Sequence, residues 1–425
     1  DQWLPAMQAG KTVFGGKANR LSYALSKVND PRAIEALAEV INSGTLKGDD
    51  LGNALSTIAS LGTPAQVGKL LDLAENNPRW LSSIARGAAF NQVAPESKEK
   101  VVPFLKSEEA MVRMAAATLC GAWKLTGAEK ELIRGAIAAK ASREVLAMTT
   151  ALARIGAMDA LARLSDAGTP VELRALALAA WAGVNPEKTA TSAAKILRGL
   201  KDASVAALVF KAFLGREEGP AALAKALAGN SLPKPIAVAG SKTVSISGRH
   251  VPQLIAALNK AGGLKPISQA LSADERGVLL ADARKKVDPA QGQKIYERAA
   301  MACTTCHLVN GKGGKLGPDL STLGAYMTPE SILESVLNPS TDVKQGYETV
   351  LVTRKDQTLV SGLLQRKTDT AVLVRDPSGS VVSIPTGEVA KIDTSPVSLM
   401  PPGLTSTLRR DELVDLMSYL TTLGK

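Results

Sequence analysis

The sequence predicts a mainly α-helical fold in two parts: an N-terminal helical array and a smaller C-terminal domain that contains a short β-sheet. Ala and Leu, both strong helix formers, recur at short intervals in a chain with only 3% aromatic residues. Apolar residues repeat at helical spacing until about residue 265, whereas a stretch near 350–390 alternates in the twofold manner of strands. With 425 residues and 45% hydrophobic content, the chain is too long for one small core, so two or three domains are expected.

The N-terminal part, which we assign to residues 1–275, is expected to consist of helices of about 10 to 15 residues joined by tight turns. In several places a helix ends at Gly or Asn and a Pro then begins the next helix, where its missing N–H is not needed. These places are "LSKVNDPRAIEAL" at 25, "IASLGTPAQVGKLL" at 58, "LSDAGTPVELRALAL" at 164 and "WAGVNPEKTA" at 181. Recurring helix–turn–helix units of this kind resemble HEAT-like repeats, which build an α-solenoid. A non-repeating helical domain is the alternative.

The second domain is assigned to residues 276–425, with the boundary between about 270 and 288 and "SADERGVLLADARKKV" as a connecting helix. Its first helix is expected to start with Asp288 as the cap and Pro289 in the first turn. A later helix, "TPESILESVLNPS", has Thr328 as its cap. The chain ends in an amphipathic helix, "TLRRDELVDLMSYLTTLGK".

The first and last helices of this domain are expected to cross closely. Gly292 and Tyr296 lie four residues apart in the first helix. Leu416, Tyr419 and Leu420 lie on one side of the last helix. A small residue that faces larger ones lets two helices approach each other.

Between these helices, residues 345–393 are expected to form a β-meander of about four strands. The segments are rich in Val, Thr and Leu and are separated by "KDQ", "KTD" and "PSGS". The predicted strands are "YETVLVTR", "TLVSGLLQR", "TAVLVRD" and "VVSIPTG".

The chain has only three cysteines and two histidines, and the segment CTTCH at 303–307 holds three of these five residues. Two thiols at this spacing can add across the two vinyl groups of a heme, and the adjacent His is then placed to bind the iron. The pattern therefore predicts one covalent heme c, bound through Cys303 and Cys306 with His307 as an axial ligand.

Other uses of CTTCH account for fewer of the residues in the motif. A structural zinc site needs four ligands, but only Cys120 and His250 remain, each isolated in a helical segment. A thioredoxin-like pair needs a βαβ surround and no His, and a structural disulfide leaves His307 unexplained. We expect Cys120 to be a buried thiol and His250 to be a surface residue near a helix start.

The sequence "GGKLGPDLS" follows CTTCH and is expected to pass close to the flat macrocycle. In c-type cytochromes a carbonyl of such a Gly-Pro pair accepts a hydrogen bond from Nδ1 of the proximal His, which leaves Nε2 for the iron. Gly317 and Pro318 are candidates for this role, and an ordinary turn is the alternative.

The second axial ligand is expected to be a methionine, because no other His lies in this domain. The candidates are Met327, Met400 and Met417. Met327 and Met417 lie in helical segments and are more simply explained by packing. Met400 lies in "SPVSLMPPGL", a proline-stiffened loop that can present a distal ligand, so Met400 is the predicted ligand.

The order of these features resembles the Planctomycete/Verrucomicrobial-type c-type cytochrome domain from about residue 288 to 425. The resemblance depends on CTTCH, "GPDLS", "TPESILESVLNPSTDV", "GYETVLVT", the meander, "SLMPPGL" and the last helix. In that family a sheet interrupts a class I-like cytochrome c fold before the Met loop. The domain often follows helical repeats at the end of sugar-dehydrogenase-like chains with a β-propeller; no propeller is found here, so dehydrogenase activity is not carried over.

Charge favours a protein partner over nucleic acid. The net charge of +11 lies entirely before Lys286, because the segment from there to the end holds fifteen basic and fifteen acidic residues. The excess Lys and Arg are scattered among acids with few aromatics for base stacking, which is typical of a solvated surface. We expect no nucleic acid, and a redox partner that is acidic would suit this surface.

The function expected from these features is a monoheme electron carrier. The partner would be a dehydrogenase donor or a cytochrome or oxidase acceptor, docked by the helical part. The alternatives are an electron-accepting tail of a larger sugar or alcohol dehydrogenase, a peroxidase-like heme enzyme if Met400 dissociates, and an interaction scaffold. Heme attachment takes place outside the cytoplasm, so a periplasmic or other extracytoplasmic location is expected. No apolar run approaches the roughly 18 to 20 residues that cross a bilayer, and Asp1 in place of an initiator Met suggests a processed or partial chain.

Overall fold

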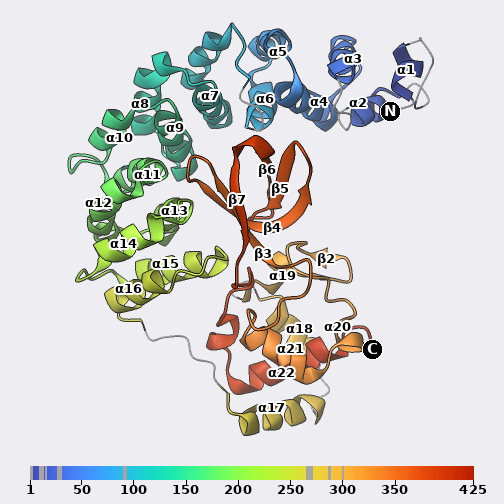
Figure 1. Ribbon diagram of the computed structural model, residues 1–425, viewed down its shortest axis with the longest axis vertical. Helices are drawn as coiled ribbons and strands as arrows, with labels where there is room; N and C mark the ends of the chain where they lie inside the picture. The colour runs from blue at the N-terminus through green and yellow to red at the C-terminus, as the bar shows by residue number, and fades with distance from the viewer. Residues whose placement is uncertain are drawn as a thin grey trace. The chain divides into compact units, whose positions relative to one another are not determined.

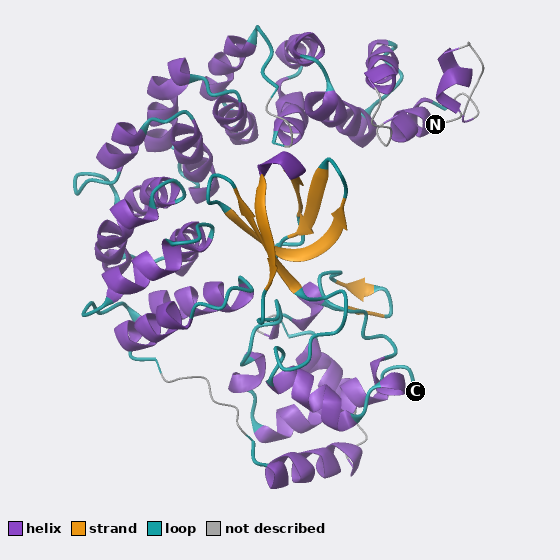
Figure 2. Ribbon diagram, in the orientation of Figure 1, coloured by secondary structure: helices purple, strands orange, loops and turns teal. Residues whose placement is uncertain are grey.

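The structure is a computed structural model that describes residues 3–8, 14, 17–25, 31–89, 93–264, 271–285, 289–298 and 301–425 (Figure 1). Most of these residues are helical, and strands are confined to a small region of the chain (Figure 2), which confirms the mainly α prediction. The chain divides into two compact units, Asp1–Val184 and Asn185–Lys425. This division lies within the helical array, and the domain boundary at 275/276 stays a prediction.

The first unit is built from helices that pack on neighbours close in sequence: α4 packs on α6, α7 on α9, and α9 on α11. Their buried faces are mainly Leu, Ile, Val and Ala. The helices are α1 (Trp3–Gln8), α2 (Ala18–Leu25), α3 (Pro31–Asn42), α4 (Gly48–Leu61), α5 (Pro64–Asn76), α6 (Leu81–Ala88), α7 (Ala110–Ala122), α8 (Glu129–Ala138), α9 (Ser142–Arg154), α10 (Met158–Leu164) and α11 (Val171–Ala182). Short 3₁₀ turns lie at Pro78–Trp80, Lys98–Lys106 and Thr126–Ala128.

Helix starts follow the predicted Pro punctuation at Pro31, Pro64 and Pro186, whereas Pro170 lies just before the first helical residue of α11. Thr63 caps α5 by accepting from Gln66 N, Gln66 in turn accepts from Thr63 N, and Pro64 is the first helical residue. Asn185 caps α12 by accepting from Lys188 N, ahead of Pro186. These caps satisfy N–H groups that have no partner within the helix.

The second unit begins with five helices in which α12 packs on α14, α13 on α15, and α14 on α16. They are α12 (Pro186–Gly199), α13 (Ala203–Leu214), α14 (Gly219–Leu227), α15 (Lys234–Ile246) and α16 (Pro252–Gly262). Packing of each helix on near neighbours is what a repeat array requires, but the HEAT-like assignment stays a prediction.

The C-terminal part of this unit has its own helical core. Its helices are α17 (Ala273–Lys285), α18 (Pro289–Tyr296), α19 (Cys303–Cys306), α20 (Leu323–Tyr326), α21 (Pro329–Leu337) and α22 (Arg410–Thr422). Helix α22 lies at the centre, in contact with α17, α18, α20 and α21. Thr328 accepts a hydrogen bond from Ser331 N and so caps α21, as predicted. The proposed cap Asp288 lies outside the described residues.

The predicted close crossing of the first and last helices is confirmed. A Cβ added to Gly292 of α18 would lie 2.1 Å from the carbonyl oxygen of Asp415 and 2.6 Å from Cβ of Tyr419, both on α22. The rings of Tyr296 and Tyr419 have centroids 5.7 Å apart. Only glycine permits this separation of the two backbones.

The inserted sheet has five antiparallel strands in the order β6-β5-β4-β3-β7. They are β3 (Thr349–Arg354), β4 (Leu359–Lys367), β5 (Ala371–Arg375), β6 (Val381–Pro385) and β7 (Val389–Thr394). The first four are the predicted meander. The fifth was not expected: β7 returns to pair with β3, Val350 opposite Thr394. Its sequence "VAKIDT" is largely exposed and half polar, so it lacks the apolar signal of the other strands.

A second, two-stranded hairpin of β1 (Leu308–Val309) and β2 (Lys312–Gly313) follows α19 directly. Among the described residues, no helix has the length and apolar character that a membrane span requires.

Candidate heme-binding site

The CTTCH segment forms a single helical turn that places both cysteines on one short element. Helix α19 runs from Cys303 to Cys306, and His307 N donates to Cys303 O at 2.9 Å. Ala302, just before it, has φ of 54°, in the left-handed region that a non-Gly residue seldom adopts. The chain therefore turns sharply into the motif.

Both cysteines are unpaired thiols, and their surroundings keep them protonated. Burial raises the pKa of the Cys303 thiol to about 11 and also raises the pKa of Cys306. A dithiol redox site of the thioredoxin kind depends on a lowered thiol pKa. The raised pKa values thus disfavour that use of CxxC.

The imidazole of His307 is oriented by the loop that follows it. Nδ1 of His307 lies 2.9 Å from the carbonyl oxygen of Pro318, so Nδ1–H donates to this acceptor. Burial lowers the pKa of His307, and the hydrogen bond to Pro318 opposes this shift only in part. Among the described residues, Nε2 of His307 makes no hydrogen bond. A neutral ring with Nδ1–H engaged and Nε2 free is the form that binds iron.

The glycine-rich loop after the motif folds tightly back over it. Gly314 N donates to Thr304 O at 2.9 Å and Gly317 N donates to Cys306 O at 2.7 Å. A Cβ at Gly317 would lie 2.6 to 3.1 Å from three atoms of the His307 ring. Glycine at 317 therefore lets the backbone lie flat against the imidazole, a contact that explains this residue beyond an ordinary turn.

One aromatic residue of the helical core, Tyr296, contacts the backbone of the motif. Tyr296 Oη donates to His307 O at 3.4 Å, a long hydrogen bond. Burial, the largest cause, raises the pKa of Tyr296, so its hydroxyl stays protonated. Sequence analysis used Tyr296 for helix packing only and missed this hydrogen bond to the His307 backbone.

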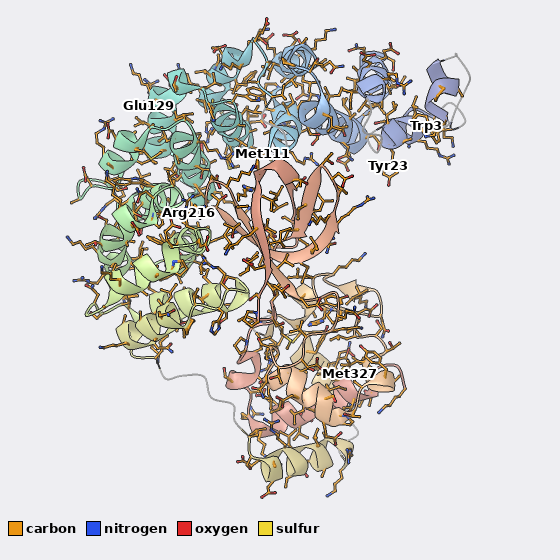
Figure 3. The ribbon with its side chains drawn as sticks, in the orientation of Figure 1. Trp3, Tyr23, Met111, Glu129, Arg216 and Met327 are labelled. Carbon is orange, nitrogen blue, oxygen red and sulfur yellow. The ribbon has the colours of Figure 1, made fainter. Side chains whose placement is uncertain are left out.

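The three candidate methionines lie in different surroundings. Met417 is fully buried in the helical core, and Met327 packs against the same core from a half-buried position (Figure 3). Met400 is half-buried and is not part of that core. Packing thus accounts for Met327 and Met417 and leaves Met400 without such a role.

The neighbour of Met400 connects its loop to the CTTCH segment. Leu399 is buried with Leu316 and Leu363, and Cys306 and Tyr347 pack against this cluster. Sequence analysis missed Leu399; the apolar residue before Met in "SLM" was the available signal. The cluster brings the stem of the Met400 loop to the side of the motif that carries Cys306.

The remaining cysteine and the remaining histidine belong to the helical array. Cys120 is buried in α7, where burial raises its pKa to about 12, and His250 is exposed two residues before α16. Both positions confirm the predictions. In the part of the chain that the structure describes, no cluster of three His, Cys, Asp or Glu residues could hold a metal ion.

Comparison with known proteins supports one class for this region. Residues 289–352 match the family model described as Cytochrome c. The match starts at the first residue of α18, ends in β3 and so spans the whole CTTCH segment and its loop. A search of the curated proteins finds no match.

The match supports a c-type cytochrome domain in this part of the chain, and a domain of this kind binds heme covalently. Cytochrome c domains are typical of electron-transfer proteins and are usually extracytoplasmic. The Planctomycete/Verrucomicrobial-type assignment stays a prediction.

Proposed function

We propose that this chain is a monoheme c-type cytochrome that transfers electrons through a His/Met-ligated heme. The observation that carries the proposal is the environment of His307: Nδ1 is held by Pro318 O at 2.9 Å, Gly317 lies against the ring, and two free thiols precede it on one helical turn. Cys303 and Cys306 would hold the group through thioethers, His307 would be the proximal ligand and Met400 the distal one.

The bound heme would supply one-electron oxidation and reduction. The residues of this chain would set the conditions for it. Pro318 fixes the tautomer and orientation of His307, and a thioether ligand from Met400 would favour the reduced state. With both axial positions filled by side chains, the iron would have no position for substrate, which favours electron transfer over peroxidase chemistry.

The helical array would dock the redox partner, a dehydrogenase donor or a cytochrome or oxidase acceptor. The net charge of +11 supports this role, because all of the excess lies before Lys286 and would attract an acidic partner. Helices that pack mainly on near neighbours in sequence support a HEAT-like array. Covalent heme attachment supports a periplasmic or other extracytoplasmic location.

The test is spectroscopic, on the heme-loaded protein. We expect a low-spin c-type spectrum after reduction and a weak Met-to-iron absorption band in the red when the protein is oxidised. Met400→Ala should abolish this band and lower the midpoint potential, while Cys303 and Cys306 keep the heme attached.

Met327→Ala is the matched control, since Met327 is a half-buried methionine of the same domain, and it should leave the band unchanged. A high-spin ferric spectrum in the unmodified protein would refute the His/Met assignment. So would loss of the band in Met327→Ala and not in Met400→Ala.

A further inference from the structure

The corner that follows α15 touches the stem of the Met400 loop. This corner, Ser247 to Arg249, belongs to the helical array, and it lies far in sequence from the CTTCH segment. Its contacts with the sheet and the loop stem all fall within the unit Asn185–Lys425.

Gly248 is the point of closest approach. It is buried with φ of +66°, and an added Cβ would lie 2.5 Å from Cγ2 of Thr349 and 2.9 Å from Cδ2 of Leu399. Its carbonyl oxygen accepts a hydrogen bond from Ser395 Oγ at 2.5 Å, in a buried position. The corner thus meets both the first residue of β3 and the segment that leads from β7 to Met400.

Arg249 fixes this corner to the rest of the array. Its guanidinium donates to the carbonyl oxygens of Leu214 and Arg216 at 2.7 Å and of Glu217 at 3.1 Å. Burial lowers the pKa of Arg249, and the three carbonyls solvate its charge. Arg249 therefore joins the corner to the loop after α13, and we call the two segments together the array surface.

The loop after α13, which is part of the array surface, also contacts the sheet. Leu359 N at the start of β4 donates to Gly215 O at 2.8 Å. Arg216 follows α13 (Figure 3), and its side chain donates to Asp356 O at a distance of 2.8 Å. These two hydrogen bonds fix the β3–β4 turn to the helical array.

The stem of the Met400 loop runs from this surface toward the CTTCH segment. Ser395 N donates to Thr349 O at 2.8 Å, and Ser395 Oγ reaches the corner. Met400 N donates to Ser398 Oγ at 3.1 Å. Leu399 precedes Met400 in the chain, and it contacts both Gly248 and the cluster against which Cys306 packs.

We propose that Gly248 and Ser395 are positioning residues for Met400, so that the helical array holds the loop that supplies the distal ligand. This inference rests on the proposed function, because it presupposes that Met400 binds the iron. A stem clamped at both ends keeps the thioether at one distance and angle, which is the condition for a stable Met–iron bond. The array would then set the heme potential as well as dock a partner.

Gly248→Ala tests the inference in the heme-loaded full chain. The new methyl group meets Thr349 and Leu399, so the stem must shift, and we expect a weaker Met-to-iron band and a lower midpoint potential. Gly229→Ala is the matched control: φ there is +75°, and nothing lies within 4 Å of an added Cβ. Gly229→Ala introduces a similar backbone strain and should change neither the Met-to-iron band nor the midpoint potential. Thr349→Ser in the Gly248→Ala background removes the methyl group of closest contact and should restore part of the band.

Ser395→Ala is the second variant, since it removes, without any clash, the hydrogen bond to Gly248 O together with the one that Ser395 Oγ accepts from Val397 N. If Gly248→Ala does not accumulate with heme, Ser395→Ala alone tests the inference. A midpoint potential of Ser395→Ala below that of the unmodified protein would then support it. Unchanged band and potential in Ser395→Ala, or in both variants, would overturn the inference while leaving the ligand assignment intact. Absence of the band from the unmodified protein would instead overturn the proposed function.

Discussion

The crossing of α18 and α22 gives the sharpest test of the fold around the site. Gly292→Ala adds one methyl group at a point 2.1 Å from Asp415 O, whereas ordinary contact begins at 3.4 Å. The atom in contact is backbone, which cannot rotate away. The helices must therefore separate by about 1 Å, which would also part the Tyr296 and Tyr419 rings.

Two opposing effects set the magnitude. Alanine in place of glycine inside a helix contributes about 1 kcal/mol of helix propensity. Overpacking a close contact typically costs about 1–3 kcal/mol, and a backbone clash lies at the upper end of that range. The expected net loss is about 1–2 kcal/mol, which for a unit of this size lowers Tm by roughly 2–8 °C.

The assay is thermal unfolding of the heme-loaded protein, followed by heme absorbance so that it reports on this domain. Gly277→Ala in α17 is the control, because nothing lies within 4 Å of an added Cβ there. The same chemical change should then raise Tm by up to about 4 °C. A Tm of Gly292→Ala equal to or above that of the unmodified protein would show that the helices do not cross this closely.

Three further predictions concern the motif and its surroundings. Gly317→Ala should displace the His307 ring and weaken its hydrogen bond to Pro318, measured as a shift in midpoint potential; no shift would refute the close contact. Thiol labelling of the heme-loaded protein should detect no thiol when folded and one, Cys120, after denaturation, whereas three would contradict covalent attachment. The hydrogen bond from Arg298 is the largest cause that lowers the pKa of Glu412 below its usual value of 4.5. The ionised Glu412 therefore stabilises the fold above about pH 4.5, and this stabilisation is lost as the pH falls below that value. Glu412→Gln should reduce the fall in Tm between about pH 5 and pH 3, and an unchanged fall would refute this linkage.

The helices and most strands were predictable because local patterns determine them. Pro64 and Pro186 follow Thr and Asn caps, and the four strands of the meander have Val- and Thr-rich alternation. Gly292 was predictable as well, since a glycine opposite large residues on a facing helix has few other uses. For the caps and the strands, the cause lies within a few residues of the chain.

What sequence analysis missed depends on contacts between distant segments. Strand β7 is set by pairing with β3, about forty residues earlier, and its own composition is half polar. Gly248 has an ordinary turn sequence, and only the structure places it against Leu399. Leu399 and Cys306 likewise meet through tertiary packing, which no local pattern encodes.

The pairing of β7 with β3 also bears on how such a chain can arise. Because Val350 lies opposite Thr394 and Ser395 N bonds to Thr349 O, the chain enters and leaves the sheet on adjacent strands. Opposed residues in an antiparallel pair are about 5 Å apart, close to the spacing of consecutive residues along a chain. A host helical fold can accept or lose a segment whose ends meet in this way without moving its own helices. The sheet is thus an insertion whose two ends meet at one point of the chain, and its strands can change in length and sequence wherever they do not contact the helical array.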